Sequence, residues 1–182
     1  SESAAPPPIA AVMADQLGML NLSEIQLWRR NPDGSASNVA VIGSSLTPVL
    51  VRGEIDGFFA PVATQIAALN NNVLATGGFQ MTSTPVDYTS TGTVSWNTIT
   101  YDAPVQPAIV RIQLGSPLRL SDLLTCVIFN RTDGVQSRLG GNIVRLLSGG
   151  DPSNLTTVLE TTLPTLPDSS AANQVRVDYA PS

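Results

Sequence analysis

Hydrophobic and polar positions along much of the chain alternate with the period of β-strands. In residues 23–30, Ile25 and Leu27 share a face with Arg29, and polar or amphipathic residues occupy the other face. That second face consists of Glu24, Gln26, Trp28 and Arg30. Asn31-Pro32-Asp33-Gly34 follows and predicts a type I turn. Residues 38–42 then predict the second strand of a hairpin.

The remaining chain predicts strand after strand, separated by turns rich in Gly, Pro, Asn and Asp. The helices that a βαβ architecture needs are missing from the pattern. The expected fold is therefore mainly β, an antiparallel β-sandwich or a jelly-roll-like barrel with one or two short helices. The further predicted strands cover residues 48–54, 74–81, 92–101, 108–114, 124–130, 136–138, 142–147 and 156–162, and a short last strand contains Val175 and Val177.

Two segments have helical spacing instead. The first contains Ile9, Val12, Met13, Leu17 and Leu20 and predicts a short helix, which could lie on a neighbouring surface as readily as on its own domain. The second has Phe58, Val62, Ile66 and Leu69 on one stripe and predicts a helix over residues 61–69, with residues 70–72 ending it. We expect an extended arm over residues 1–8, one β-rich domain over 9–163, and a Pro/Ser-rich segment over 164–182.

The composition excludes most catalytic chemistry. The chain has no lysine and no histidine, and its 9 basic residues, all arginine, face 14 carboxylates for a net charge of −5. Histidine-based triads, imidazole metal sites, Schiff-base lysines and P-loop lysines are therefore absent. The single cysteine, Cys126, stands in an apolar run and is expected to be a buried small hydrophobe. We expect no enzyme activity, no cofactor and no metal.

Carboxylates are the remaining candidates for acid–base chemistry. Glu54 and Asp56 are spaced i, i+2 and would share a face of a strand, as a glycoside-cleaving pair requires. The simpler interpretation is a strand that runs into an Asp-Gly turn, so a carboxylate-dependent hydrolase is the least favoured hypothesis. The glycine pairs at 77–78, 140–141 and 149–150 fit no phosphate-binding motif and predict turns or bulges.

Aromatic and cationic residues suggest one ligand surface. Trp28, Arg30, Trp96 and Tyr101 could form a platform on which a sugar or a base stacks. The alternative is that these residues anchor the core or a protein interface. Such a platform would make the chain a carbohydrate-binding or adhesion module, extracellular or secreted, with surface glycans as partners.

The low charge points to a different function. Charged residues make up 13% of the chain, about half of the roughly 25% typical of soluble domains. A surface with so few charges is expected to be covered by neighbours, because the centres of interfaces are depleted in Lys, Glu and Asp. The leading hypothesis is a non-enzymatic structural subunit whose partners are copies of itself or other shell proteins. The scattered arginines argue against nucleic-acid binding, and no apolar run reaches the length of about 18 residues that a membrane-spanning helix needs.

The chain resembles the β-sandwich coat, protrusion or surface proteins of small virions. The features that carry the resemblance are the Pro-rich arm of residues 1–8, short Val/Ile/Thr strands, the helix predicted over 61–69, and loops such as 31–34 and 149–152. The resemblance implies a location in a virion. Coat proteins that contact a genome resemble each other in a basic terminal arm, which is not found here. The implied position is therefore an outer layer or protrusion, or an inner shell around a double-stranded genome.

Overall fold

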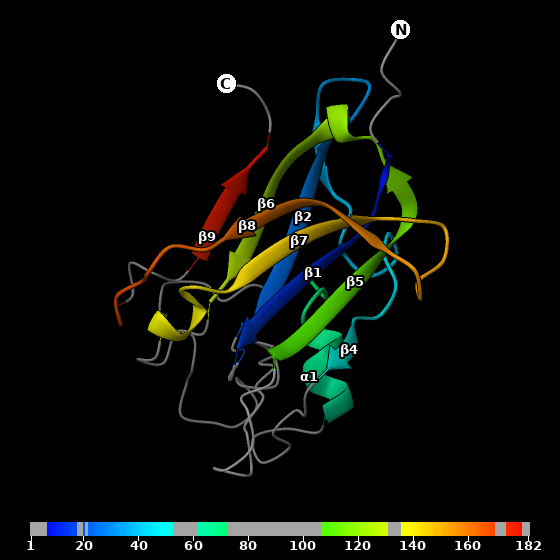
Figure 1. Ribbon diagram of the computed structural model, residues 1–182. Coiled ribbons are helices and arrows are strands. Elements are labelled where there is room, and N and C mark those ends of the chain that lie inside the picture. The colour runs from blue at the N-terminus through cyan, green and yellow to red at the C-terminus, as the bar shows by residue number, and fades with distance from the viewer. Residues whose placement is uncertain are drawn as a thin grey trace, which may run out of the picture.

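Two antiparallel β-sheets face each other in the computed structural model, which describes residues 7–17, 20, 22–52, 62–72, 107–130, 136–169 and 174–179. The sheets form two layers (Figure 1). Sheet A has the order β4 (Val49–Arg52), β5 (Pro107–Leu118), β1 (Ile9–Leu17), β7 (Ile143–Ser148) and β8 (Thr156–Thr162). Sheet B has the order β3 (Ala36–Asn38), β2 (Glu24–Arg30), β6 (Leu123–Phe129) and β9 (Gln174–Asp178). The mainly β class is confirmed, and of the two predicted architectures the sandwich is the one observed.

The chain crosses repeatedly between the two layers. β1 and β2 follow each other but lie in different sheets, and so do β5 and β6. β1 pairs antiparallel with β5, and β2 pairs antiparallel with β6. This Greek-key type of connection joins strands that are distant in the sequence. Each half of the described chain therefore needs the other to complete both sheets.

The core lies between the layers. Buried side chains alternate with partly exposed ones along residues 108–114 of β5, as expected for a strand with one buried face, whereas residues 125–128 of β6 are buried on both faces. Cys126 is fully buried in this core, as predicted. The fully or almost fully buried residues include Val12, Ala14, Ile25, Leu27, Val110, Ile112, Cys126, Ile128, Val144 and Leu146.

The helix predicted from Ile9 to Leu20 is wrong, because residues Ile9–Leu17 form β1. This strand lies at the centre of sheet A, between β5 and β7. Ala11 and Ala14 are both buried although they point to opposite faces. A strand covered on both faces has a continuous apolar run without strict alternation, and such a run can contain helical spacings by coincidence.

The hairpin prediction is confirmed. β2 pairs with β3, and the amide of Gly34 donates to the carbonyl of Asn31 at 2.9 Å. Gly34 has a φ of +87°, a conformation that glycine adopts without strain. The position predicted for the second strand is wrong: β3 covers Ala36–Asn38 and shares only Asn38 with the predicted residues 38–42. The side chain of Asn38 accepts hydrogen bonds from the amides of Leu27 and Ala40, which replaces further strand pairing.

Most later predictions are also confirmed. Strands β4, β5, β6, β7, β8 and β9 lie where the sequence predicts them, whereas the predicted strands at 74–81 and 92–101 lie outside the described residues. The strand predicted at 136–138 is wrong, because Gln136–Leu139 forms a 3-10 helix (η2). The carbonyl of Gln136 accepts from the Asn130 side chain and the amide of Ser137 donates to Asp168, so neither group is available to a ladder.

The predicted second helix is confirmed as α1 (Val62–Ala68), a single short helix beside β4 and β5 (Figure 1). It ends in the buried residues Leu69 and Asn70, and the amide of Ile25 donates to the carbonyl of Leu69 at 2.9 Å. Asn72 has a φ of +61° and turns the chain away from the helix. The end of α1 is thereby attached to sheet B.

Candidate functional site

Trp28 and Arg30 project from the outward face of β2, as the alternation predicts. Trp28 is half-buried and Arg30 is exposed. Trp96 and Tyr101 lie outside the described residues, so the predicted platform is described only for its first two members. On the described part of this face, one indole ring and one guanidinium are available for contact.

A chain of hydrogen bonds runs along this outward face. The indole Nε1 of Trp28 donates to Oε1 of Gln26 at 3.0 Å, and Nε2 of Gln26 donates to Oδ1 of Asn72 at 3.4 Å. The amide of Asn72 in turn donates to Oε2 of Glu24 at 2.8 Å. The polar group of Trp28 is therefore used inside the molecule, and a ligand could use only its ring face.

Glu24 is the most unusual ionisable group in this hydrogen-bonded chain. The residue is 1% exposed, and burial raises its pKa to about 8. Hydrogen bonds from the backbone of Asn72 and Asn71 act in the opposite direction, but their effect on the pKa is smaller. Sequence reasoning places Glu24 on a polar outward face and therefore misses its burial. The residues after α1 that cover it are distant in the sequence, so no local signal could have shown the contact.

The described residues contain neither a cluster of potential metal ligands nor an activated thiol. None of them forms a group of three or more His, Cys, Asp or Glu side chains that could bind a metal ion. Burial raises the pKa of Cys126 to about 12, so its thiol is not activated. Glu54 and Asp56 lie outside the described residues. Within the described part, no helix is long and apolar enough to cross a membrane.

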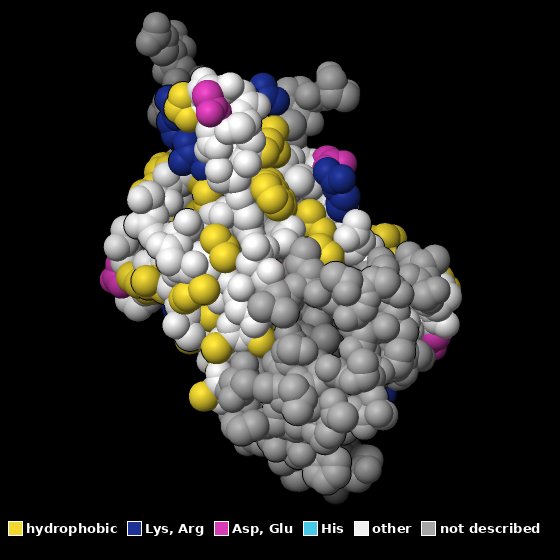
Figure 2. Space-filling model, turned by 180° about the vertical axis from the view of Figure 1, so that it is seen from behind, with side chains coloured by type: hydrophobic (Ala, Val, Ile, Leu, Met, Phe, Trp, Pro, Cys, Tyr) yellow, Lys and Arg dark blue, Asp and Glu magenta, His cyan; other side chains and the backbone are white. Residues whose placement is uncertain are grey.

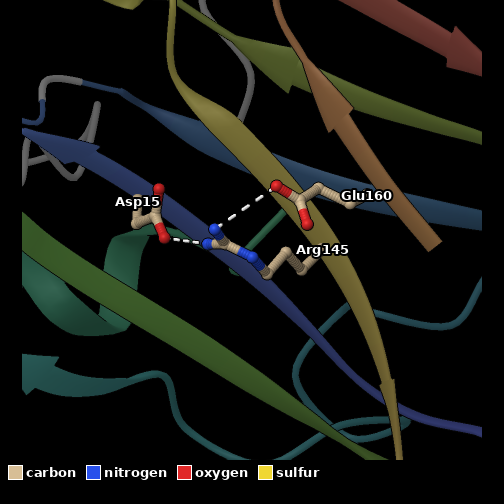
Figure 3. Close-up of polar contacts among 3 residues, drawn as sticks. All are labelled: Asp15, Arg145 and Glu160. Carbon is tan, nitrogen blue, oxygen red and sulfur yellow. Dashed lines mark hydrogen bonds and ion pairs between the residues drawn. The ribbon is translucent and has the colours of Figure 1, made fainter. Parts of the chain in front are cut away.

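An ionic cluster lies on the outward face of sheet A. Arg145 of β7 lies between Asp15 of β1 and Glu160 of β8, and its guanidinium bonds to both carboxylates (Figure 3). The contact with Glu160 is 3.5 Å long. The three strands are neighbours, and the three residues lie close together on the same face of the sheet. The cluster therefore links the three strands on their outward side. Both carboxylates bond to the same guanidinium, so all three charged groups have a partner inside the molecule. This favours a structural role over a ligand site.

A third surface is apolar and is not indicated by any motif in the sequence. Ile42, Leu46, Val49 and Val51 are each 45–55% exposed, and they are the large hydrophobic side chains found exposed among the described residues. We name these four residues the apolar edge, because they lie along the outer side of β5, at one end of sheet A. The signal that could have indicated it is the absence of any charged residue between Asp33 and Arg52.

The apolar edge is held firmly in place. Leu46 donates its amide to the carbonyl of Gln113 at 2.9 Å, and the amide of Ile42 donates to the carbonyl of Asn70 at 2.9 Å. The buried side chain of Asn70 donates to the carbonyls of Ala40 and Leu46, at 3.0 and 3.1 Å. These hydrogen bonds fix an irregular segment against the sheet, so its hydrophobic side chains are presented on a defined surface.

Two cations adjoin the apolar edge, since Arg52 ends β4 and Arg111 is paired with Val49, and no described carboxylate is paired with it. Seen from behind, the middle of the described surface shows hydrophobic side chains among uncharged polar ones, and the charged side chains lie towards its upper end and its margins (Figure 2). A surface of this kind needs little desolvation of charge before another protein covers it.

Comparison with known proteins gives no match: no family model, no curated protein and no solved structure matches the chain.

Proposed function

We propose that the chain is a non-enzymatic structural subunit of a larger assembly and acts through protein–protein contacts. The observation that carries this proposal is the apolar edge. Isolated exposed hydrophobic side chains are normal on protein surfaces, but a group of them on one ordered segment marks an interaction surface. Here every large hydrophobic side chain found exposed in the described residues belongs to one stretch, residues 42–51.

The low charge supports the same function. With 13% charged residues, the chain has few groups to keep a free monomer soluble at high concentration. Coverage by neighbours removes that need, because a protein interface is best made from uncharged surface. The sandwich fold fits this use, since a rigid scaffold can present different edges and faces to different neighbours.

The assembly that we propose is a virion, in which the chain is a coat, protrusion or outer-surface protein. This part of the proposal rests on the resemblance described above and on the sandwich that it implies. The nine arginines are scattered along the sequence. Three of the described ones are engaged with carboxylates: Arg119 with Asp122, Arg145 with Asp15, and Arg176 with Asp178. That distribution favours contacts with protein over contacts with packaged nucleic acid.

A carbohydrate-binding or adhesion module is the second candidate. Its supporting observation is that Trp28 and Arg30 share an outward face, as sugar-stacking surfaces require. If this function holds, Trp28→Ala should abolish binding on a glycan array while circular dichroism shows an unchanged fold. An array without signal for the wild-type chain would remove this candidate.

Sedimentation velocity over a range of concentrations tests the leading proposal. We expect the purified chain to self-associate reversibly as its concentration rises, because nothing else then covers its uncharged surface. A stable monomer at high concentration would contradict the proposal. Electron micrographs of the source material supply the second readout, since a structural subunit should be found in symmetric particles.

A further inference from the structure

The apolar edge lies at an open end of sheet A. β4 pairs with β5 on one side, and no described strand lies on its other side. An edge strand carries backbone amides and carbonyls that can pair with a strand of another chain. We propose that β4 pairs antiparallel with β4 of a second copy across a two-fold axis, so that two five-stranded sheets join into one. This inference rests on the proposed function and names the partner of its surface.

The edge extends well beyond β4 itself. The amide of Gly115 donates to the carbonyl of Ser44 at 2.8 Å, Ser45 pairs with Leu114, and Val49 pairs with Arg111. Residues 44–52 thus follow β5 in one antiparallel direction. Residues 46–48 form no strand and Pro48 has no amide to donate, so the pairing with a second copy is assigned to β4. The hydrogen bonds from Asn70 keep this edge ordered before any partner arrives.

The other sheet ends are less suited to self-pairing. Edge strand β8 carries Glu160, and edge strand β9 carries Arg176 and Asp178, whose side chains are largely exposed. Charges on an edge strand discourage pairing with another chain. Edge strand β3 carries no charge, but it has only three residues, and its last side chain, Asn38, accepts from the amides of Leu27 and Ala40. β4 has two exposed valines and one charge, Arg52, at its end. The partner is therefore expected at β4.

The charge distribution allows a second copy at this edge. Each copy carries a net charge of −5, so two copies repel each other except where their contact surfaces carry no negative charge. The segment between Asp33 and Arg52 has no charge of its own, and the guanidinium of its cross-strand neighbour Arg111 donates to the carbonyl of Pro152. With the axis near Leu50, antiparallel pairing places Val49 opposite Val51 of the second copy, and Arg52 opposite Pro48. The two cations then lie apart, and identical apolar side chains meet, as a two-fold interface requires.

Two charge variants of the full chain test the pairing. Val49→Glu and Val51→Lys each place a charge against valine and a like charge diagonally across the axis. The carboxylate is assigned to position 49 because Val49 is paired with Arg111 of its own β5, where a lysine would add a like charge. Each variant alone should weaken self-association roughly tenfold or more in sedimentation velocity. An equimolar mixture should recover association to within a few-fold of the wild type, because the new cation of one copy then lies opposite the new carboxylate of the other. Circular dichroism of each variant should match the wild type, since both positions are exposed.

Thr157→Lys is the matched control, because Thr157 is exposed on β8, the edge strand at the opposite end of the same sheet. It should leave self-association unchanged. Equal weakening by this variant, or wild-type association by both valine variants, would overturn the β4 pairing while the proposed function stands. Failure of the mixture to recover would likewise overturn the pairing. A wild-type chain that never self-associates would overturn both proposals.

Discussion

Arg145 shows how a charged residue serves the fold in a chain with few charges. Its guanidinium joins Asp15 and Glu160 across three neighbouring strands, and the side chains of Arg145 and Asp15 are only 21% and 13% exposed. A carboxylate that is mostly covered needs its partner, because ionised groups are poorly solvated there. By contrast, the side chain of Arg119 is 79% exposed in its pair with Asp122.

The two arginines should therefore differ in their effect on stability. Arg145→Met should lower the free energy of unfolding by about 1–3 kcal/mol, because it leaves Asp15 without its cation. Arg119→Met should change it by less than about 0.5 kcal/mol, since exposed pairs contribute little. Urea unfolding followed by fluorescence measures both. Equal losses for the two variants would contradict a structural role for the ionic cluster.

Glu24 predicts a pH dependence of stability. Burial raises its pKa from the usual 4.5 to about 8, so the folded chain binds this proton more tightly than the unfolded chain. The stabilisation is complete below about pH 4.5 and is lost as the pH rises towards 8. Glu24→Gln removes the titration, so the stability of the variant relative to the wild type should rise by on the order of 3 kcal/mol between these pH values.

Urea unfolding at several pH values measures this difference. Thr157→Ala is the control, because it alters an exposed side chain that does not titrate. That variant should keep the wild-type shape of the stability curve. A constant difference between Glu24→Gln and the wild type across the pH range would show that Glu24 has no raised pKa.

At the scale of elements, local sequence is informative where an element is half-buried and misleading where it is fully covered. β5 and β9 alternate in burial because one face meets the core, and the sequence predicts both. β2 alternates in sequence although Glu24 and Gln26 on its outward face are buried, so the sequence predicts the strand but not its coverage. β1 is covered on both faces, so its pattern carries no strand period and its helical spacing is coincidental. The 3-10 helix η2 is not predictable locally, because its conformation depends on hydrogen bonds from Asn130 and to Asp168, which lie outside it.

The turn between β7 and β8 offers a prediction at this scale. Gly149 has a φ of +141°, and a Cβ at that position would lie 2.9 Å from the backbone oxygen of Asn154. Gly149→Ala should therefore lower the free energy of unfolding by roughly 1–3 kcal/mol. Gly150 has open space around its Cα, so Gly150→Ala is the matched control and should be nearly neutral. Thermal unfolding of both variants checks the difference, and similar midpoints would contradict the assigned turn conformation.

The whole molecule combines a net negative charge with an uncharged contact surface, which predicts the effect of salt. Raising sodium chloride from about 20 mM to about 0.5 M should strengthen self-association several-fold, because it screens the repulsion between like-charged copies. Sedimentation equilibrium at several salt concentrations measures this dependence. Weaker association at high salt would indicate an ionic contact and would contradict the apolar edge as the interface.

The sequence by itself determined the class of fold and much of the excluded chemistry. Strand periodicity and turn residues are local properties, so they predicted a mainly β fold, a sandwich or a barrel, together with the hairpin turn at 31–34 and the helix at 61–69. The absence of His and Lys is a property of composition and needs no structure. Whether Trp28, Arg30, Trp96 and Tyr101 share one surface stays a prediction for the last two residues.

Only the tertiary structure decided what each surface residue meets. Glu24 is buried because Asn72 covers it. Arg145 links three strands because β1 and β8 lie beside β7. The apolar edge is exposed because residues 42–51 lie at the end of a sheet. These outcomes depend on contacts between residues that are far apart in the chain. A local pattern encodes which faces are apolar, and the packing of the layers decides which of those faces remain exposed.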